Sequence, residues 1–232
     1  MNIVVTGGTK GIGRAIIETF AAQGFNIITC ARNAVDLNML RTELHSKYPG
    51  IEVFISTCDM GDKKQVKEFA TSIKSKFDTI DVLVNNAGLF IPGSLTEEAE
   101  GVFETMMNIN IAGTYHITRE LMPIIKNSNA AHIFNICSTA SITPYTNGGS
   151  YCISKFALLG FSKVLREELK TQNIKVTSVL PGATLTNSWA GTTLPNTRFM
   201  LSEEVAEAIL GCYKLKNTVV EELLMRPQLG DI

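Results

Sequence analysis

The chain has 232 residues, of which 45% are hydrophobic and 19% are charged, and its formal net charge is −1 at pH 7. These values are typical of a globular protein, and we expect one domain spanning residues 1–232. The balanced charge gives no sign of a nucleic-acid partner, and no apolar run reaches the roughly 18 residues of a membrane helix, so we expect no membrane partner.

The start of the chain combines a strand pattern, a glycine-rich loop and a helix pattern. Residues 1–6 are apolar and rich in β-branched residues, residues 7–13 hold the glycines, and residues 14–24 have helical spacing. A dinucleotide-binding turn requires this order, because glycines let the backbone approach a pyrophosphate and the helix N-terminus supplies amide donors. The spacing Gly7, Gly11, Gly13 differs from G-x-G-x-x-G, and glycines also form ordinary tight turns.

The end of the second predicted strand, residues 25–30, indicates the choice of cofactor. NAD-selective folds place an acidic residue about 20 positions past the glycines, on the ribose 2′-hydroxyl. No Asp or Glu occupies positions 30–33, and we assign Asp36 to the next helix. Arg32 and Lys10 are two cations that suit a 2′-phosphate. The sequence therefore predicts NADP(H), with NAD(H) as the less favoured cofactor and two solvated surface cations as the alternative interpretation.

Strands and helices continue to alternate along the chain. Further strands are predicted at 51–56, 80–84, 131–137, 174–180 and 219–225, with helices at 63–77, 97–126 and 150–172 and a short capping-box helix opening at Ser202. Alternation predicts an α/β fold of the Rossmann type, a doubly wound parallel sheet of about seven strands with helices on both faces. Ligands bind at the carboxyl ends of such strands, and we expect these residues to gather there: Gly7, Arg32, Asp59, Asn85, Ser138 and Pro181.

Tyr151 and Lys155 lie four residues apart in a predicted helix, so their side chains share one face. A free phenol has a pKa of about 10, and a nearby ammonium stabilises the phenolate, which favours proton donation near neutral pH. Ser138 lies thirteen positions upstream of Tyr151, where its hydroxyl would hold the oxygen that receives the proton. The pattern predicts acid–base chemistry at an oxygen atom.

The cysteines and histidines show no metal or disulfide pattern. The five cysteines are odd in number and include no C-x-x-C pair, so we expect free thiols in a cytoplasmic protein. The histidines, His45, His116 and His132, lack the spacing of a metal site, and we expect none.

The motifs together resemble those of the short-chain dehydrogenase/reductase family over nearly the whole chain. Thr6-Gly7-x-x-x-Gly11-x-Gly13 is similar to the cofactor loop of that family, and this loop also contains Thr9, Lys10 and Ile12. A second set resembles the motif after the fourth strand: Asn85-Asn86-Ala87-Gly88. A third set matches the catalytic tetrad in order and spacing: Asn110, Ser138, Tyr151 and Lys155. A fourth set matches the segment beside the nicotinamide: Pro181, Gly182 and Thr186.

The resemblance implies a role for each of these residues. Tyr151 would be the acid in carbonyl reduction and the base in alcohol oxidation, Lys155 would bind the nicotinamide ribose, and Ser138 would orient the substrate oxygen. Asn110 would hold a water that relays protons, Asn86 would support the sheet beside the cofactor, and Asp59 and Thr186 would contact adenine and carboxamide. Plainer interpretations stay open: Asp59 as a turn cap, Asn110 as a helix kink, and Ser141 in the place of Ser138.

The resemblance implies an oxidoreductase that transfers a hydride between NADP(H) and a small carbonyl or alcohol substrate. A catalytically inactive NADP(H) sensor or scaffold, and an epimerase or dehydratase of the same fold, are the alternatives. We expect residues 187–201, with Pro144 and Tyr145, to border a small apolar pocket, with 187–201 as a lid. Ketones, 3-oxoacyl thioesters and pterin carbonyls remain open as substrates. The helices with Asn110 and Tyr151 are apolar on several sides, so they need a second partner surface, with complete burial within one subunit as the alternative. The resemblance implies that these helices form subunit contacts, so we expect a homodimer or homotetramer.

Overall fold

The computed structural model describes residues 1–186, 189 and 191–232, and its strands form one parallel sheet. Within these residues the sheet has seven strands: β1 (Asn2–Thr6), β2 (Asn26–Ala31), β3 (Val53–Thr57), β4 (Val82–Asn85), β5 (His132–Ile136), β6 (Lys175–Pro181) and β7 (Glu222–Met225). The strand order is β3-β2-β1-β4-β5-β6-β7. The order reverses between β1 and β4, and such a switch point opens a crevice at the carboxyl ends of the strands.

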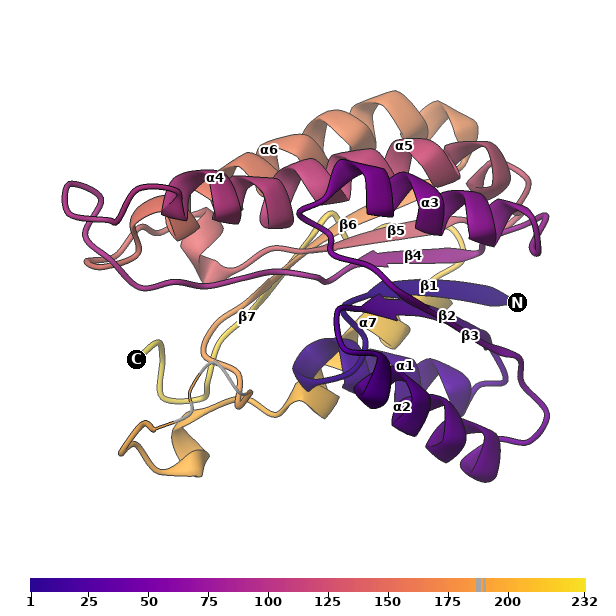
Figure 1. Ribbon diagram of the computed structural model, residues 1–232, viewed down its shortest axis with the longest axis horizontal. Coiled ribbons are helices and arrows are strands. Elements are labelled where there is room, and N and C mark those ends of the chain that lie inside the picture. The colour runs from indigo at the N-terminus through magenta and orange to yellow at the C-terminus, as the bar shows by residue number, and fades with distance from the viewer. Residues whose placement is uncertain (187–188, 190) are drawn as a thin grey trace.

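Helices cover both faces of the sheet, as Figure 1 shows. One layer holds α1 (Gly11–Ala21), α2 (Ala34–Lys47) and α7 (Ser202–Lys214), and the other holds α3 (Lys63–Lys74), α4 (Val102–Met107), α5 (Gly113–Ile125) and α6 (Gly149–Leu169). Each layer has its own buried apolar cluster, one around Phe20 and the other around Phe69. The predicted doubly wound Rossmann-type fold is confirmed. No helix in the described part of the chain is long and apolar enough to span a membrane.

The predicted helix at 97–126 is wrong in its details. The helical tract starts at Val102, and the π-helical segment η1 (Asn108–Ala112) separates α4 from α5. Apolar periodicity continues through such a turn, so the pattern in the sequence does not reveal the change of helix type. The described residues also include the short 3₁₀ segments η2 (Thr139–Ser141), η3 (Lys170–Gln172) and η5 (Asn196–Arg198).

The capping box predicted at Ser202 is only half formed. Leu201 is the N-cap of α7, and its backbone N–H donates to the Glu204 carboxylate at 3.0 Å. The Ser202 hydroxyl instead donates to the Leu185 carbonyl at 3.4 Å, and the helix runs for 13 residues, so it is not short. Ser202 is the first helical residue of α7 and follows the N-cap position, so its hydroxyl does not cap the helix.

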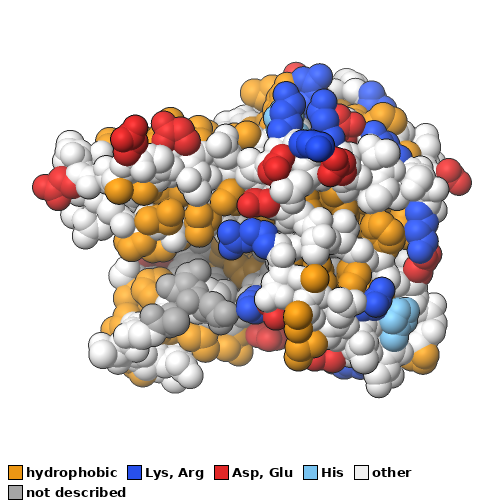
Figure 2. Space-filling view, in the orientation of Figure 1, with side chains coloured by type: hydrophobic (Ala, Val, Ile, Leu, Met, Phe, Trp, Pro, Cys, Tyr) orange, Lys and Arg blue, Asp and Glu red, His pale blue; other side chains and the backbone are white. Residues whose placement is uncertain are grey.

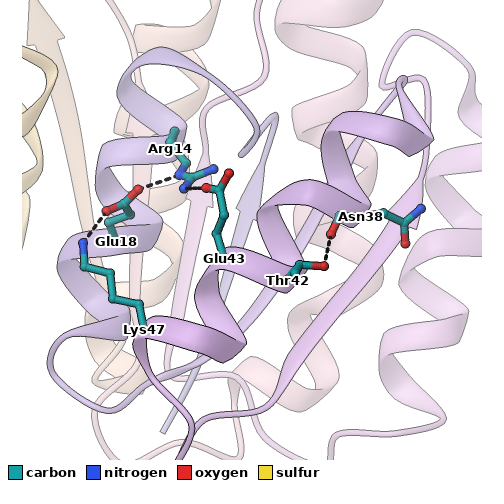
Figure 3. Close-up of polar contacts among 6 residues, drawn as sticks. All are labelled: Arg14, Glu18, Asn38, Thr42, Glu43 and Lys47. Carbon is teal, nitrogen blue, oxygen red and sulfur yellow. Dashed lines mark hydrogen bonds and ion pairs between the residues drawn. The ribbon is translucent and has the colours of Figure 1, made fainter.

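Ion pairs join α1 to α2, as Figure 3 shows. Glu18 accepts hydrogen bonds from Arg14 at 2.7 Å and from Lys47 at 2.9 Å, and Arg14 also contacts Glu43. Leu40 and Leu44 are the residues of α2 that join the apolar cluster. The contacts hold together α1 and α2, the helices that follow the predicted 2′-phosphate contacts Lys10 and Arg32.

Candidate active site

The glycine loop leaves the N-terminus of α1 open to a ligand. Gly7 and Gly11 have positive φ values of 69° and 54°, which side chains disfavour. Lys10 is the N-cap of α1 and makes no side-chain capping bond among the described residues, whereas Asn33 and Asp62 cap α2 and α3 with their side chains. The first amide groups of α1 therefore keep donor capacity for an anion.

The 86–88 motif packs directly against the glycine loop. The Asn86 side chain donates to the carbonyls of Thr6 at 2.9 Å and Gly7 at 3.0 Å. The Thr6 hydroxyl accepts the backbone N–H groups of Asn86 and Ala87, both at 3.0 Å. A Cβ atom at Gly13 would overlap the Asn86 amide and lie 2.5 Å from the Gly7 carbonyl. The loop is therefore built around the side chain of Asn86, the first residue after β4, and around Thr6, to which the sequence motif assigned no role.

The two predicted phosphate-binding cations differ in their surroundings. Arg32 is exposed at the end of β2. Lys10 is also exposed, but its ammonium forms an ion pair with Asp36 at 2.9 Å. Asp36 lies in the first turn of α2, as predicted. An acidic residue, Asp36, therefore lies beside Lys10, although positions 30–33 contain no Asp or Glu.

Tyr151 and Lys155 lie in the first two turns of α6 and share a face, as predicted. The Lys155 ammonium lies 5.6 Å from the centre of the Tyr151 ring. Lys155 is only 5% exposed, and its ammonium donates to the Ile136 carbonyl at 2.8 Å. Ile136 ends β5, two residues before Ser138. This bond ties α6 to the end of the strand that carries Ser138.

The hydroxyl groups of Ser138 and Ser141 have different surroundings. Ser141 is 1% exposed, and its hydroxyl accepts the Ser138 backbone N–H at 3.2 Å. Ser138 is half-buried, and its hydroxyl accepts the Ala140 N–H at 3.1 Å as the cap of η2. The hydroxyl of Ser138 keeps its proton for another partner because it only accepts in this bond.

Asn110 lies inside the π-helical turn and is 1% exposed. Its side-chain oxygen accepts the Leu89 N–H at 2.7 Å, and its amide donates to the Leu89 carbonyl and to the Ser154 hydroxyl, both at 2.9 Å. A Cβ at Gly88 would lie 3.5 Å from Asn110 and 3.6 Å from the Lys155 ammonium. The helix change thus brings Asn110 to α6 and to the 86–88 motif.

The remaining predicted residues surround this centre. The Asp59 carboxylate accepts the Gly61 N–H at 2.8 Å. This is the turn-capping contact that the sequence analysis gave as the alternative to an adenine contact. Thr186 lies against the glycine loop, since a Cβ at Gly11 would be 3.1 Å from its methyl group. Pro181 ends β6, and the Gly182 N–H donates to the Met225 carbonyl at 2.8 Å.

The segment after Thr186 lies partly outside the described residues. The predicted lid includes positions 187, 188 and 190, which the structure does not describe. In the described part, Trp189 packs edge-on against Phe199 with ring centres 4.9 Å apart, and Thr184 pairs with Met200. Figure 2 shows a hollow in the molecule between the layer that carries α4 and the segment before α7.

Two aromatic residues lie beside Tyr151. The Phe90 ring meets the Tyr151 ring edge-on, with centres 4.8 Å apart, and no motif in the sequence singles it out. Burial raises the pKa of the Tyr145 phenol, and the proximity of Tyr151 and Cys152 raises it further. Tyr145 therefore stays protonated at neutral pH, and with Pro144 it lines a groove of about 500 Å³.

Comparisons with known proteins identify the family. The short chain dehydrogenase family model matches residues 1–195. The chain is 32% identical to a sepiapterin reductase of Chlorobaculum tepidum, covering 99% of this chain and 97% of the relative. It is 33% identical to the NADP-dependent 3-hydroxy acid dehydrogenase YdfG of Escherichia coli, covering 89% and 80%. An alcohol dehydrogenase of Thermococcus sibiricus, solved with 5-hydroxy-NADP, superposes with a TM-score of 0.91 at 27% identity, covering 98% and 96%. The chain belongs to the short-chain dehydrogenase family.

Proposed function

We propose that the chain is an NADP(H)-dependent reductase of small carbonyl compounds that also oxidises the corresponding alcohols. The observation that carries the proposal is Tyr151 beside Lys155, whose ammonium is fixed to the end of β5. Oxidoreductase membership of the family supports it, and so do the relatives that use or bind NADP. Reduction is the direction that we favour.

The proposed cofactor site runs along the carboxyl edge of the sheet. The pyrophosphate would face the open N-terminus of α1, and the exposed cations Lys10 and Arg32 would meet the 2′-phosphate. Other proposed contacts follow the chain across the sheet edge: Gly7, Thr9, Gly11, Ile12, Gly13, Asp59, Asn86, Ala87, Gly88, Pro181, Gly182 and Thr186. The positive φ values of Gly7 and Gly11 and the uncapped helix support this fit.

In the proposed chemistry the protein supplies position and proton transfer, and the nicotinamide supplies the hydride when it is bound. Tyr151 donates its phenolic proton to the carbonyl oxygen as negative charge develops there, and Ser138 donates a second hydrogen bond to the same oxygen. The Lys155 ammonium stabilises the phenolate that remains. Asn110 holds the water through which a proton returns, next to Lys155 and Ser154.

A panel of substrates tests the function. Absorbance at the NADPH band is followed with an aromatic ketone, a 3-oxoacyl thioester and a pterin ketone, and with a 3-hydroxy acid and NADP⁺ in the reverse direction. The relatives named sepiapterin reductase and 3-hydroxy acid dehydrogenase support the last two choices. We expect turnover with at least one substrate, faster with NADPH than with NADH. Tight NADPH binding without turnover on any of them would instead favour the sensor or scaffold.

We also propose that the protein acts as a homodimer or homotetramer in the cytoplasm, with both sites in one domain. The exposed side of α6 presents an apolar stripe of Ile153, Phe156 and Val164, which favours a second copy as its cover. All five cysteines are free thiols, as a reducing compartment favours. Light scattering of the wild type and of Phe156→Glu measures the assembly, and the variant should shift the mass toward the monomer.

A further inference from the structure

A carboxylate from a distant segment caps the helix that carries Tyr151. Glu98 accepts the Ser150 backbone N–H at 2.8 Å, and the Ser150 hydroxyl donates to the other oxygen of the same carboxylate. Ser150 is fully buried. The N-cap residue of α6, Gly148, has no side chain that could do this. Glu98 therefore satisfies donors of the first turn from 52 residues away in the sequence.

Glycines make room for this carboxylate on both sides. A Cβ at Gly149 would overlap the Glu98 carboxylate, and a Cβ at Gly93 would lie 2.9 Å from Glu98 Cγ. The Gly93 N–H donates to the Asn147 carbonyl at 3.0 Å, and Gly93 pairs with Gly148 in an isolated β-bridge. The segment that carries Glu98 is therefore clasped to the start of α6 by backbone bonds as well.

The contact lies next to the proposed proton donor. Tyr151 follows Ser150 directly and lies in the first turn of α6, where a helix frays most easily. Phe90, which packs edge-on against Tyr151, belongs to the same segment as Glu98. Lys155 lies one turn further along and has its own anchor at the Ile136 carbonyl. Tyr151 therefore lies one residue from the Glu98 contact, whereas Lys155 has an anchor independent of that contact.

We propose that Glu98 is a positioning residue for the reaction. It acts through Ser150 and the first turn of α6, and it holds the Tyr151 phenol in register with the Lys155 ammonium and against Phe90. The inference rests on the proposed reductase function for its effect on rate, and on the hydrogen bonds alone for its effect on the helix.

The test compares Glu98→Ala, Glu98→Gln and the control Glu97→Ala, an exposed acid on the same segment. We expect Glu98→Ala to lower kcat for the fastest ketone by about 10- to 100-fold, because a small misplacement of a reacting group costs this much. The dissociation constant of NADPH should change by no more than about twofold, because Lys155 keeps its own anchor. Glu98→Gln should recover most of the rate, since its amide oxygen still accepts the Ser150 N–H. Glu97→Ala should match the wild type.

Hydrogen–deuterium exchange supplies a readout that needs no substrate. The peptide spanning residues 149–155 should exchange faster in Glu98→Ala than in the wild type and in Glu97→Ala. Wild-type kcat in Glu98→Ala, or a loss that Glu98→Gln does not restore and that extends to NADPH binding, would overturn the positioning role. If the wild type reduces no carbonyl, the proposed function fails by itself, and unchanged exchange in Glu98→Ala then overturns the inference separately.

Discussion

The N-termini of α1 and α6 are built alike, but their free backbone N–H groups have different partners. Each helix starts after glycines, and neither N-cap residue has a capping side chain. At α6 the Glu98 carboxylate occupies the donors, whereas at α1 no capping side chain does so in the part of the chain that the structure describes. A carboxylate of the protein itself at a helix N-terminus, as at α6, holds the first turn in place. A helix N-terminus without such a group, as at α1, is suited to bind the anion of a ligand.

The largest expected effect comes from removing the proposed proton donor, Tyr151, in the first turn of α6. Tyr151→Phe keeps the ring against Phe90 and removes only the phenolic oxygen, so kcat should fall by about 10²- to 10⁴-fold. NADPH binding should stay nearly intact, because the open end of α1 is unchanged. Steady-state kinetics and fluorescence titration with NADPH measure the two quantities. Turnover at the wild-type rate would remove Tyr151 from the mechanism and leave α6 without its proposed role.

A matched pair of glycine variants tests whether the glycine loop at the N-terminus of α1 binds NADPH. Gly13→Ala forces a methyl group onto the Asn86 amide and the Gly7 carbonyl, and such overpacking costs about 1–3 kcal/mol. The glycine loop must shift, so we expect NADPH to bind at least about tenfold more weakly, which is about 1.4 kcal/mol. Gly211→Ala is the control, since its methyl group meets nothing within 4 Å in α7, and it should stabilise the fold by about 0.4–1 kcal/mol. Calorimetry gives both quantities, and equal NADPH affinity in the two variants would contradict the close fit.

Local patterns in the sequence predicted the parallel sheet and the positions of its strands, because buried strands and glycine loops carry local signals. They also placed Tyr151 and Lys155 on one helical face, since that follows from a spacing of four. The contact of Glu98 with Ser150 was out of reach, because 52 residues separate the partners and no motif joins them. The π-helical turn at Asn110 was not predicted either, because apolar periodicity continues through it, and the partners of the Asn110 side chain, Leu89 and Ser154, are distant in the sequence.

Acid stability sets the pH range in which the two helix ends can be compared. His132 lies at the start of β5, stacked on Phe134, and donates from Nε2 to Thr177 Oγ1 because that hydroxyl gives its proton to Val220. Its Nδ1 is buried without a partner among the described residues, and burial lowers the pKa of His132 to about 3. The pKa of this histidine in the unfolded chain is about 6.5. At pH values between about 6.5 and about 3, the histidine is therefore protonated in the unfolded chain and neutral in the folded protein. Stability should therefore fall by up to about 1.4 kcal/mol per pH unit as the pH drops through this window.

Denaturant unfolding at several pH values between 7 and 4.5 checks this expectation. His132→Gln should lose most of the acid dependence, because an amide takes up no proton in either state. His45→Gln changes an exposed histidine of α2 and should retain the wild-type slope. An identical slope in all three proteins would assign the acid sensitivity to other groups. Rates for Tyr151 and Glu98 variants are therefore best compared above about pH 6.5.

The smallest expected effect concerns the choice of nucleotide at the open end of α1. Asp36 holds the Lys10 ammonium at 2.9 Å, although Lys10 is 60% exposed there, and a 2′-phosphate would compete for the same cation. Exposed pairs of this kind contribute about 0–1 kcal/mol, so Asp36→Asn should tighten NADPH binding by only about two- to fivefold. Lys10→Ala should weaken NADPH binding by a similar factor. NADH is the internal control, because it lacks the 2′-phosphate and its affinity should not change in either variant. If both nucleotides respond equally, the cation serves the pyrophosphate, and the open helix end is then a general anion site that does not select NADPH.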